Sequence, residues 1–479
     1  MKNTDQFKEL GISSNILKAL EKKGYQKPTL IQEEVIPRFL EQKTDIIAQA
    51  KTGTGKTAAF AIPLLQLIKE NTDYIQALIL TPTRELALQV TNELESMKGG
   101  LKTDVVSIYG GQKIQPQIRA LKDGADIVVG TPGRVLDHIR SGRLNLAKIN
   151  YLVLDEADEM LDMGFQEDLE AIIKTANKNR KTLLFSATMP DRVKKISEKY
   201  MKKAEFIKVK TVNEELNNIK YIVHEVSGKN KLETLCRIFD YNIDFYGLIF
   251  CRTRNDVDKL TNELQNSGYL VDGLHGEMSQ PVREKALKNL KEKKICALIA
   301  TDVAARGIDI NNLQFVINYA VPDTAEALVH RVGRTARAGK RGIAISLVSP
   351  SEISRFRKFE KQNKMIHERE KLPERDAIVE NRVKGLQTKI LKQLSEKIPE
   401  NYLQIAEKLL TFGTPESVIG ALLKEFQPDY YDISSIKKII KNRKPDAKVN
   451  KQREQRRHRK PDRNKSLKTR PSKKRKRNK

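Results

Sequence analysis

Short runs of apolar residues recur along the chain as far as Ser349, and polar stretches with helical spacing separate them. Such runs, flanked by turn residues, are typical of strands buried on both faces of a sheet. In the first half the predicted strands are 45–48, 77–80, 105–108, 127–129, 151–154 and 182–185. Strands that alternate with helices in this way predict an α/β domain with a parallel sheet.

A second alternation begins after residue 245, so two such domains are expected. Its predicted strands are 247–250, 270–274, 297–300, 315–318 and 343–348. Beyond them the pattern becomes helical in the segments 372–386, 402–410 and 414–426. Pro415 stands in the first turn of the last segment, where proline is well tolerated.

Composition narrows the class of protein. The chain has 479 residues, 39% of them hydrophobic, which suffices for more than one packed core. No run approaches the ~18 apolar residues of a membrane span, and the first residues resemble neither a signal nor a transit peptide. Three scattered cysteines, Cys236, Cys251 and Cys296, exclude a disulfide framework or a zinc site, so a cytoplasmic location is expected.

Charge is concentrated at the end of the chain. The net charge is +28, and the segment 441–479 carries 20 Lys and Arg against 3 Asp and Glu. With almost no apolar residue to bury, this tail is predicted to be disordered and to bind nucleic-acid phosphates without sequence preference. A nuclear-import signal is the alternative reading of its last residues.

The strand at 45–48 leads into AKTGTGKT, a glycine-rich phosphate loop. Gly53 and Gly55 allow backbone N–H groups to approach phosphate oxygens, and a following helix would direct its positive end at them. Lys56 adds a full positive charge, and the Thr57 hydroxyl suits Mg²⁺. The predicted nucleotide-binding residues of the loop are Ala50, Lys51, Thr52, Gly53, Thr54, Gly55, Lys56 and Thr57.

The strand at 151–154 ends at the tetrapeptide DEAD. Its first carboxylate, Asp155, is placed to hold the same Mg²⁺, and Glu156 to orient or deprotonate water. An acidic tetrapeptide alone is usually solvated surface. Its occurrence after a buried strand, together with the phosphate loop, instead predicts ATP hydrolysis.

From about Phe7 to about Ser349 the chain resembles the DEAD-box RNA helicases of superfamily two, and Ala50 fits that family's phosphate loop. The resemblance implies two tandem RecA-like domains. It also implies a Q motif, in which Gln32 reads the hydrogen-bonding edges of adenine and the rings of Phe7 and Tyr25 stack on it. The alternative for the two aromatic residues is an ordinary place in the core.

Other strings resemble the family's RNA-binding motifs. Three of them follow predicted strands, so their loops should share one edge of a parallel sheet, where Arg84 and Arg134 would neutralise phosphates. The RNA contacts expected there are Pro82, Thr83, Arg84, Gly110, Gly111, Thr131, Pro132, Gly133 and Arg134. In the second domain the resemblance adds Arg283, Thr301 and Asp302. It further implies that Asp158, Ser186, Thr188 and His330 couple hydrolysis to strand separation.

The string HRVGRTAR carries Arg331, Arg334 and Arg337 at i, i+3 and i+6. On a helix all three would lean toward one side, which predicts an anion opposite them. The resemblance assigns γ-phosphate contacts to Arg334 and Arg337 and a ribose or coupling role to Asp309. Two residues depart from the family's pattern: Ala336 is expected to fit the helix, and Ala320 to leave a carboxylate contact missing.

The sequence therefore predicts an ATP- and Mg²⁺-dependent RNA helicase that acts on structured RNA. The predicted division is a Q-motif region (1–32), the RecA-like domains (33–210 and 211–364), a helical extension (365–440) and the basic tail (441–479). The extension resembles the dimerisation segment of bacterial cold-shock DEAD-box helicases; a monomeric extension is the alternative.

A DNA-directed motor and a non-enzymatic RNA clamp remain as alternatives to the predicted RNA helicase. Ribosome assembly, RNA decay and cold adaptation are the expected processes, with a ribosome or degradation complex as partner.

Overall fold

The structure is a computed structural model that describes residues 5–50, 53–70, 72–209, 218–305, 313–336, 340–363, 367–396 and 398–426. The described residues belong to one compact unit. Lys51, Thr52, Asp309 and Arg337, for which roles are predicted above, lie outside these ranges, as does the basic tail.

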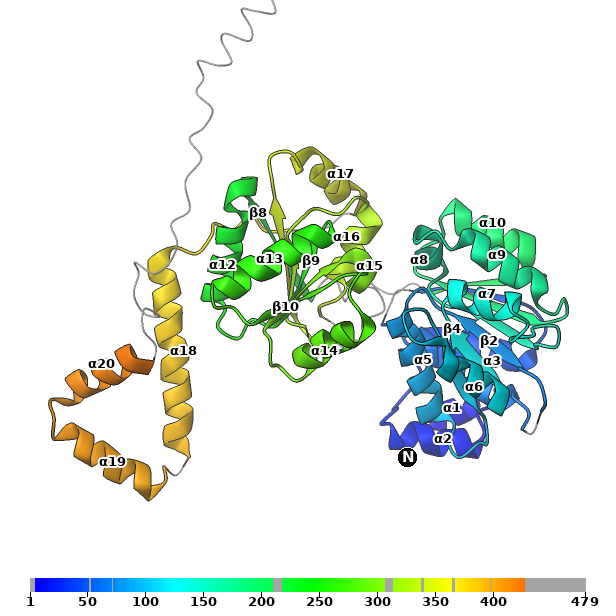
Figure 1. The fold of residues 1–479 in the computed structure, drawn as a ribbon, viewed down its shortest axis with the longest axis horizontal. Helices are drawn as coiled ribbons and strands as arrows, with labels where there is room; N and C mark the ends of the chain where they lie inside the picture. Colours follow the sequence, from blue (N-terminus) through cyan, green and yellow to red (C-terminus); the bar gives the residue numbers. More distant parts are fainter. Residues whose placement is uncertain are drawn as a thin grey trace, which may run out of the picture. The chain divides into compact units, whose positions relative to one another are not determined.

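The first domain is built on a seven-stranded parallel sheet, here called sheet A (Figure 1). Its strands are β1 (Ile46–Gln49), β2 (Ala77–Leu80), β3 (Val105–Ile108), β4 (Ile127–Gly130), β5 (Tyr151–Leu154), β6 (Lys181–Ser186) and β7 (Glu205–Lys208), in the order β3-β4-β2-β5-β6-β1-β7. Six of the seven confirm the predicted strands to within one residue at each end. The seventh, β7, was missed because its side chains are exposed except for Ile207.

Alternate residues of the buried strands enter two separate cores. In β2, Ala77 and Ile79 belong to one apolar cluster, while Leu78 and Leu80 belong to the other. Since successive side chains of a strand point to opposite faces, helices must cover both faces of sheet A. These helices are α1 (Asp5–Glu9), α2 (Ser14–Lys22), α3 (Leu30–Glu41), α4 (Lys56–Leu67), α5 (Arg84–Met97), α6 (Ile114–Asp123), α7 (Pro132–Arg140), α8 (Ala157–Asp162), α9 (Gln166–Thr175) and α10 (Asp191–Tyr200).

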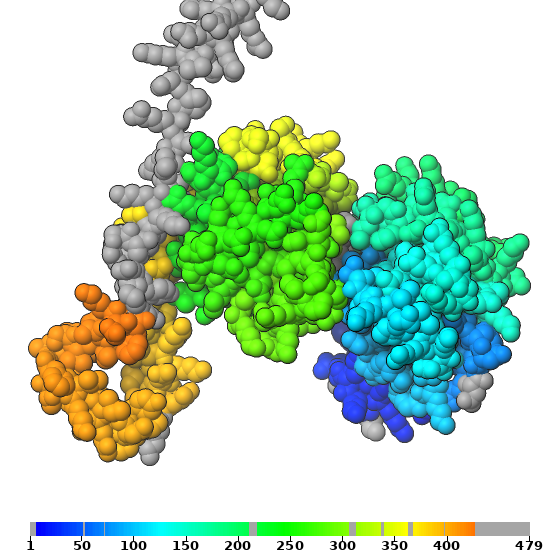
Figure 2. Space-filling model, in the orientation of Figure 1, coloured from blue at the N-terminus to red at the C-terminus, as the bar shows by residue number. Residues whose placement is uncertain are grey.

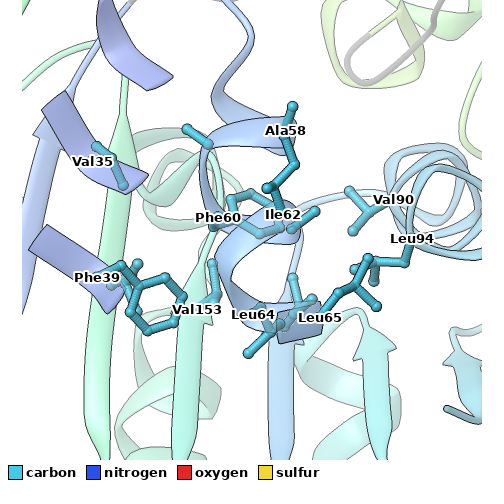
Figure 3. Packing of buried hydrophobic residues seen from close by; sticks show 14 of the residues in the cluster. Val35, Phe39, Ala58, Phe60, Ile62, Leu64, Leu65, Val90, Leu94 and Val153 are labelled. Carbon is cyan, nitrogen blue, oxygen red and sulfur yellow. The ribbon is translucent and has the colours of Figure 1, made fainter. Parts of the chain in front are cut away.

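Helix α4, which follows the phosphate loop, is the most deeply buried of the helices in the first domain. Every residue from Lys56 to Leu65 except Thr57 is buried. In Figure 3 its side chains lie between Val35 and Phe39 of α3 on one side and Val90 and Leu94 of α5 on the other. This all-round packing fixes the helix, and therefore the loop at its amino end, against the sheet.

The second domain has a six-stranded parallel sheet, sheet B, in the order β10-β11-β9-β12-β13-β8. Its strands are β8 (Ile219–Glu225), β9 (Gly247–Cys251), β10 (Val271–Leu274), β11 (Ala297–Thr301), β12 (Phe315–Asn318) and β13 (Gly342–Val348). Its helices are α12 (Lys231–Tyr241), α13 (Arg254–Asn266), α14 (Gln280–Lys291), α15 (Asp302–Ala305), α16 (Ala325–Val332) and α17 (Ile353–Asn363), with a short 3₁₀ turn at Gly228–Asn230. The predicted two-domain α/β fold is confirmed, and β8, an edge strand beside β13, is the second strand that was missed.

The extension consists of three helices, α18 (Arg375–Ser395), α19 (Glu400–Leu410) and α20 (Pro415–Phe426). The first half of α18 is held to α12: Ile378 is fully buried, and Arg382 pairs with Asp240 at 3.0 Å. The helix continues well beyond the predicted end at residue 386. No described helix is long and apolar enough to cross a membrane.

Candidate active site

The phosphate loop lies between the end of β1 and the start of α4. Gly53 and Gly55 have φ values of +86° and +89°, in the left-handed region that favours glycine. A Cβ on Gly55 would also lie 2.5 Å from Nε2 of Gln32. The loop therefore requires glycine at this position both for its backbone conformation and for the close approach of Gln32.

Residues of the predicted Q motif donate hydrogen bonds to the backbone of the phosphate loop. The Thr29 hydroxyl donates to the carbonyl oxygen of Thr54 at 2.8 Å, and Nε2 of Gln32 donates to the carbonyl oxygen of Gly55 at 3.1 Å. Oε1 of Gln32 accepts from the backbone N–H of Thr29 at 3.0 Å, within a capping box at the start of α3. The nitrogen of the Gln32 amide thus holds the loop, while its oxygen caps α3. The contact of Gln32 with adenine stays a prediction.

The two aromatic residues of that motif are placed differently from each other. Phe7 is fully buried in the core and meets the Tyr25 ring edge-on, with ring centroids 6.0 Å apart. Tyr25 is partly buried and donates its hydroxyl to Glu93 at 3.1 Å. Burial and the Glu93 charge raise the pKa of Tyr25, which stays neutral. The position of Phe7 matches the alternative reading, an ordinary core aromatic residue.

Buried ionisable groups meet where β5 ends. Asp155 is 2% exposed, and burial raises its pKa to about 7, against the opposing effect of Lys56. The Nζ of Lys56 and Oε2 of Glu156 are buried and have no hydrogen-bond partner among the described residues. Buried charges without partners are costly, so these atoms fit a site that an anion and a cation complete. Lys56 would hold phosphate oxygens of ATP, while Thr57 and Asp155 would hold Mg²⁺.

Glu156 also has an unusual backbone conformation. Its φ of +52° lies in the left-handed region, which costs a non-glycine residue about 1 kcal/mol. Asp155 accepts the Glu156 N–H at 3.0 Å, which holds the turn between β5 and α8. Strain of this kind is concentrated at functional sites, and here it directs the second carboxylate of the DEAD tetrapeptide into the site.

The predicted coupling residues are joined by hydrogen bonds. Oδ2 of Asp158 accepts from both the backbone N–H and the hydroxyl of Thr188, each at 2.8 Å, and the Ser186 hydroxyl donates to the Thr188 carbonyl at 2.6 Å. Nδ1 of His330, in α16, lies 2.8 Å from Oε1 of Glu159. Glu159 directly follows the tetrapeptide, and sequence reasoning gave it no role.

Most of the predicted RNA contacts of the first domain line one cavity of about 370 Å³. Its lining includes Pro82, Thr83, Arg84, Gly110, Thr131, Gly133 and Arg134. The lining residues that were not predicted are Glu85, Asp137, Met163, Phe165, Gly276 and Val303. Nothing in the strand pattern indicated Met163 and Phe165, which lie between α8 and α9 rather than directly after a strand.

Arg283, a predicted RNA contact, also lines this cavity but is paired with a carboxylate. Its Nε and Nη2 donate to Oε1 of Glu85 at 2.8 and 2.5 Å, and its Nη1 donates to the His275 carbonyl at 3.1 Å. The guanidinium and the carboxylate are both largely buried. The sequence did not indicate this pairing with Glu85, the residue next to Arg84. Contact of Arg283 with RNA stays a prediction.

The expectation that the arginines of HRVGRTAR lie on one side of a helix is wrong. Helix α16 ends at Val332, and Arg334 follows in a turn. Arg331 is 2% exposed and is directed into the second domain, where Asp302 binds its guanidinium through two hydrogen bonds of 2.6 and 2.7 Å. Its Nη1 donates to Oδ1 of Asn318 and to the Ala320 carbonyl. A guanidinium that has four of its five N–H groups bonded, two of them to a carboxylate, needs no further anion.

Ala336 is likewise outside the helix, contrary to the expectation that its methyl group fits one. It is buried and has a φ of +57°. The preceding Thr335 hydroxyl donates to the Leu313 carbonyl at 2.6 Å, and Gly342 passes so close that a Cβ would overlap Thr335. The end of HRVGRTAR is therefore shaped by contacts with β13 and the segment before β12, which helical spacing does not reveal.

A substitution at Gly111 tests whether the position of Arg84 matters for RNA binding. Its φ is +84°, and a Cβ at this position would overlap the guanidinium of Arg84. We expect Gly111→Ala to displace Arg84 and to weaken RNA binding several-fold in a fluorescence anisotropy titration. Gly100→Ala is the matched control, because Gly100 has a φ of +94° with nothing within 4 Å of a Cβ. Equal RNA affinity in the two variants would contradict the placement of Arg84.

The chain matches two family models. Residues 29–196 match the DEAD/DEAH box helicase model, and residues 230–339 match the helicase conserved C-terminal domain. Both matched ranges fall within the two parallel-sheet domains.

Curated relatives cover most of the chain. A probable ATP-dependent RNA helicase of Methanocaldococcus jannaschii is 51% identical over 359 residues, which are 75% of this chain and 96% of the relative. The DEAD-box ATP-dependent RNA helicase CshA of Geobacillus kaustophilus is 43% identical over 418 residues, 87% of this chain and 89% of the relative.

Two solved structures share the fold. Dbp5 of S. cerevisiae bound to RNA and ADP BeF3 is 30% identical, with a TM-score of 0.68 over 77% of this chain and 95% of that one. Mss116p bound to ssRNA and AMP-PNP is 28% identical, with a TM-score of 0.70 over 89% of this chain and 87% of that one.

Proposed function

This chain belongs to the DEAD-box family of ATP-dependent RNA helicases, and we propose that it locally unwinds short duplexes in structured RNA with little sequence preference, using Mg²⁺ and ATP. One observation carries the proposal. The buried Nζ of Lys56 and Oε2 of Glu156 have no partner among the described residues, at the end of a sheet whose neighbouring loops gather the RNA-binding motifs. A nucleotide site and an RNA groove at one sheet edge suit a motor better than a passive scaffold.

In this mechanism the residues around β1 and β5 bind and orient ATP. Lys56 and the loop N–H groups hold phosphate oxygens, and Glu156 orients a water molecule and accepts its proton. Bound Mg²⁺ supplies charge neutralisation at the phosphates. From the second domain, Arg334 is proposed to contact the γ-phosphate, as is Arg337, which lies outside the described residues.

Coupling to RNA is proposed to run through the hydrogen bonds that join the two domains. His330 contacts Glu159 beside the nucleotide site, and Arg283 contacts Glu85 beside the RNA cavity. Both sites then depend on residues from both domains, so each ligand favours the arrangement that binds the other. Closing on RNA would bend one strand away from duplex geometry and release its partner.

The lining of the RNA cavity supports binding without sequence preference. Its glycine, threonine and arginine residues provide donors for phosphate and ribose oxygens, and such contacts position a strand without reading its bases. Two relatives of the same fold have been solved with RNA bound.

Steady-state ATP hydrolysis tests this function against its rivals. We expect RNA to stimulate turnover strongly and DNA of the same sequence to stimulate it much less. Equal stimulation by DNA would favour a DNA-directed motor. An absence of turnover with any nucleic acid would favour the non-enzymatic clamp.

We also propose that the extension forms a homodimer. Large apolar side chains on and between its helices are left uncovered, with 64–84% of each exposed; among them are Leu391, Tyr402, Phe412 and Phe426. A second copy would bury them. We expect Phe412→Ser with Phe426→Ser to convert a dimer to a monomer in analytical ultracentrifugation, whereas Lys392→Ser with Lys408→Ser should leave the dimer intact. A wild-type chain that sediments as a monomer would contradict this.

The cellular role remains a proposal. Relatives that carry the name CshA, together with a non-specific motor, favour cold adaptation, ribosome assembly or RNA decay in the cytoplasm. A ribosome or an RNA-degradation complex is the partner that such roles imply.

A further inference from the structure

A basic surface lies at the edge of sheet A opposite to the predicted RNA motifs. It is formed by the loops that lead into four neighbouring strands, β5, β6, β1 and β7, and we call it the amino-edge surface. It comprises residues 143–150, 174–181, 41–45 and 201–205. These residues include nine Lys and Arg but only three Asp and Glu. The motifs that hold nucleotide and RNA follow the carboxyl ends of the strands, so the two sets of loops lie at opposite edges.

The four loops form one continuous surface because hydrogen bonds join them. The Lys181 side chain donates to the carbonyl oxygen of Lys43 at 3.0 Å, and the Lys202 side chain donates to that of Lys178 at 2.8 Å. The Asn177 N–H donates to the Leu146 carbonyl at 3.0 Å. The charges of all four loops therefore act at one place.

The acidic residues within the surface do little to balance this charge. Asp45 is buried and accepts backbone N–H groups of Thr182 and Lys202 at 2.9 and 2.6 Å. Glu205 pairs at 2.6 Å with Arg38, which lies outside the surface. Of the three, only Glu41 pairs with a lysine of the surface, Lys43 at 3.1 Å.

Three exposed lysines of the surface, Lys174, Lys178 and Lys203, form no ion pair with any described residue.

The other half of the same edge has a net charge of opposite sign. The loops that lead into β3, β4 and β2, residues 98–104, 123–126 and 68–76, carry three Lys against five Asp and Glu. Positive charge is therefore concentrated on one half of this edge rather than spread along all of it.

Helix capping accounts for only part of this charge. Lysines near helix carboxyl ends complement the helix dipole, and Lys174 in the last turn of α9 has such a place. Lys178 lies in a loop beyond the helix. Lys203 has a φ of +46°, a conformation that glycine or asparagine adopts at lower cost. A structural role does not require lysine at these two positions.

We propose that the amino-edge surface is a second RNA-binding surface. It would bind phosphates of an RNA chain just beyond the nucleotides that occupy the cavity lined by the predicted RNA contacts. The proposal rests on the proposed helicase function, because RNA is the polyanion that this function supplies. Strands of four to six residues place the two edges about 13–20 Å apart, a span that a few extended nucleotides bridge. The surface has no exposed aromatic residue in its four segments, so it would bind backbone phosphates rather than stack on bases.

The test uses the full chain with Lys174→Gln, Lys178→Gln and Lys203→Gln combined. We expect a several-fold rise in the RNA concentration that half-saturates ATP turnover when the RNA is long, about 40 nucleotides, and no change with an RNA of about 10 nucleotides. The slope of log affinity against log salt should fall by about 2, since each lost single-strand phosphate contact removes ~0.7. The maximal turnover rate and the melting temperature should stay unchanged.

The matched control replaces Lys69, Lys102 and Lys122, exposed lysines of the same domain outside the surface, by glutamine. An equal response of both triple variants would overturn the proposal, since it would reduce the effect to net charge. Unchanged affinity for long RNA would overturn it as well, and lost binding to polyglutamate in that case would assign the surface to an acidic protein. If neither RNA stimulated the wild-type chain, the helicase function itself would fail.

Discussion

Replacing Glu156 by Gln is expected to lower the maximal rate of ATP hydrolysis by about 10²–10⁴-fold while RNA binding in the presence of ATP persists. The amide has the same shape but cannot accept a proton from water. Since Oε2 of Glu156 is buried without a partner among the described residues, the neutral side chain should not destabilise the domain. Single-turnover hydrolysis and RNA titrations with ATP measure the two effects separately.

Glu167→Gln is the control for this change, because Glu167 is an exposed carboxylate in the first turn of α9. It should leave hydrolysis and RNA binding unchanged. If hydrolysis survived in the Glu156 variant, another group would have to activate the water, and the role given to the second carboxylate of DEAD would be wrong.

Arg331 and Arg334 should respond in opposite ways to replacement by methionine. Arg331→Met would leave Asp302 and Asn318 without their guanidinium, and loss of one partner from a largely buried pair costs about 3 kcal/mol. Arg334→Met should leave the melting temperature unchanged and abolish ATP turnover, since Arg334 lies beyond α16 in the turn and is proposed to contact the γ-phosphate. Thermal unfolding and ATPase assays on both variants measure this contrast.

Arg331→Lys gives a graded control for the structural part. It keeps the charge but loses the planar fork that reaches Asp302, Asn318 and the Ala320 carbonyl, so its melting temperature should fall between those of wild type and Arg331→Met. A melting temperature of Arg331→Met equal to that of wild type, together with lost ATPase activity, would return Arg331 to the anion-facing role that the helical spacing predicted.

The sequence predicted the interior strands well because their burial is continuous. The interior strands β2, β5 and β12 begin and end where predicted. The edge strand β3 was also predicted, from its apolar run, whereas the edge strands β7 and β8 were missed. An edge strand is covered less completely, so its apolar pattern is broken, as by the exposed Lys220 in β8.

The candidate site was predictable where function resides in a contiguous motif, and less so where it depends on contacts between distant residues. The phosphate loop and the DEAD tetrapeptide lie as their flanking strands indicated. By contrast, spacing placed Arg331 on a helix facing an anion, whereas Asp302 and Asn318, distant in sequence, hold it inside the second domain. The pairing of Arg283 with Glu85 is another contact between residues far apart in the chain, which a single sequence does not reveal.

The central claim is that nucleotide and RNA favour each other's binding, and it is tested most directly by measuring RNA affinity of the full chain with a non-hydrolysable ATP analogue, with ADP and without nucleotide. The account predicts RNA binding tighter by about 5–150-fold with the analogue, a coupling of about 1–3 kcal/mol, and the same factor in analogue affinity when RNA is present. RNA affinity that is equal under all three conditions would contradict it.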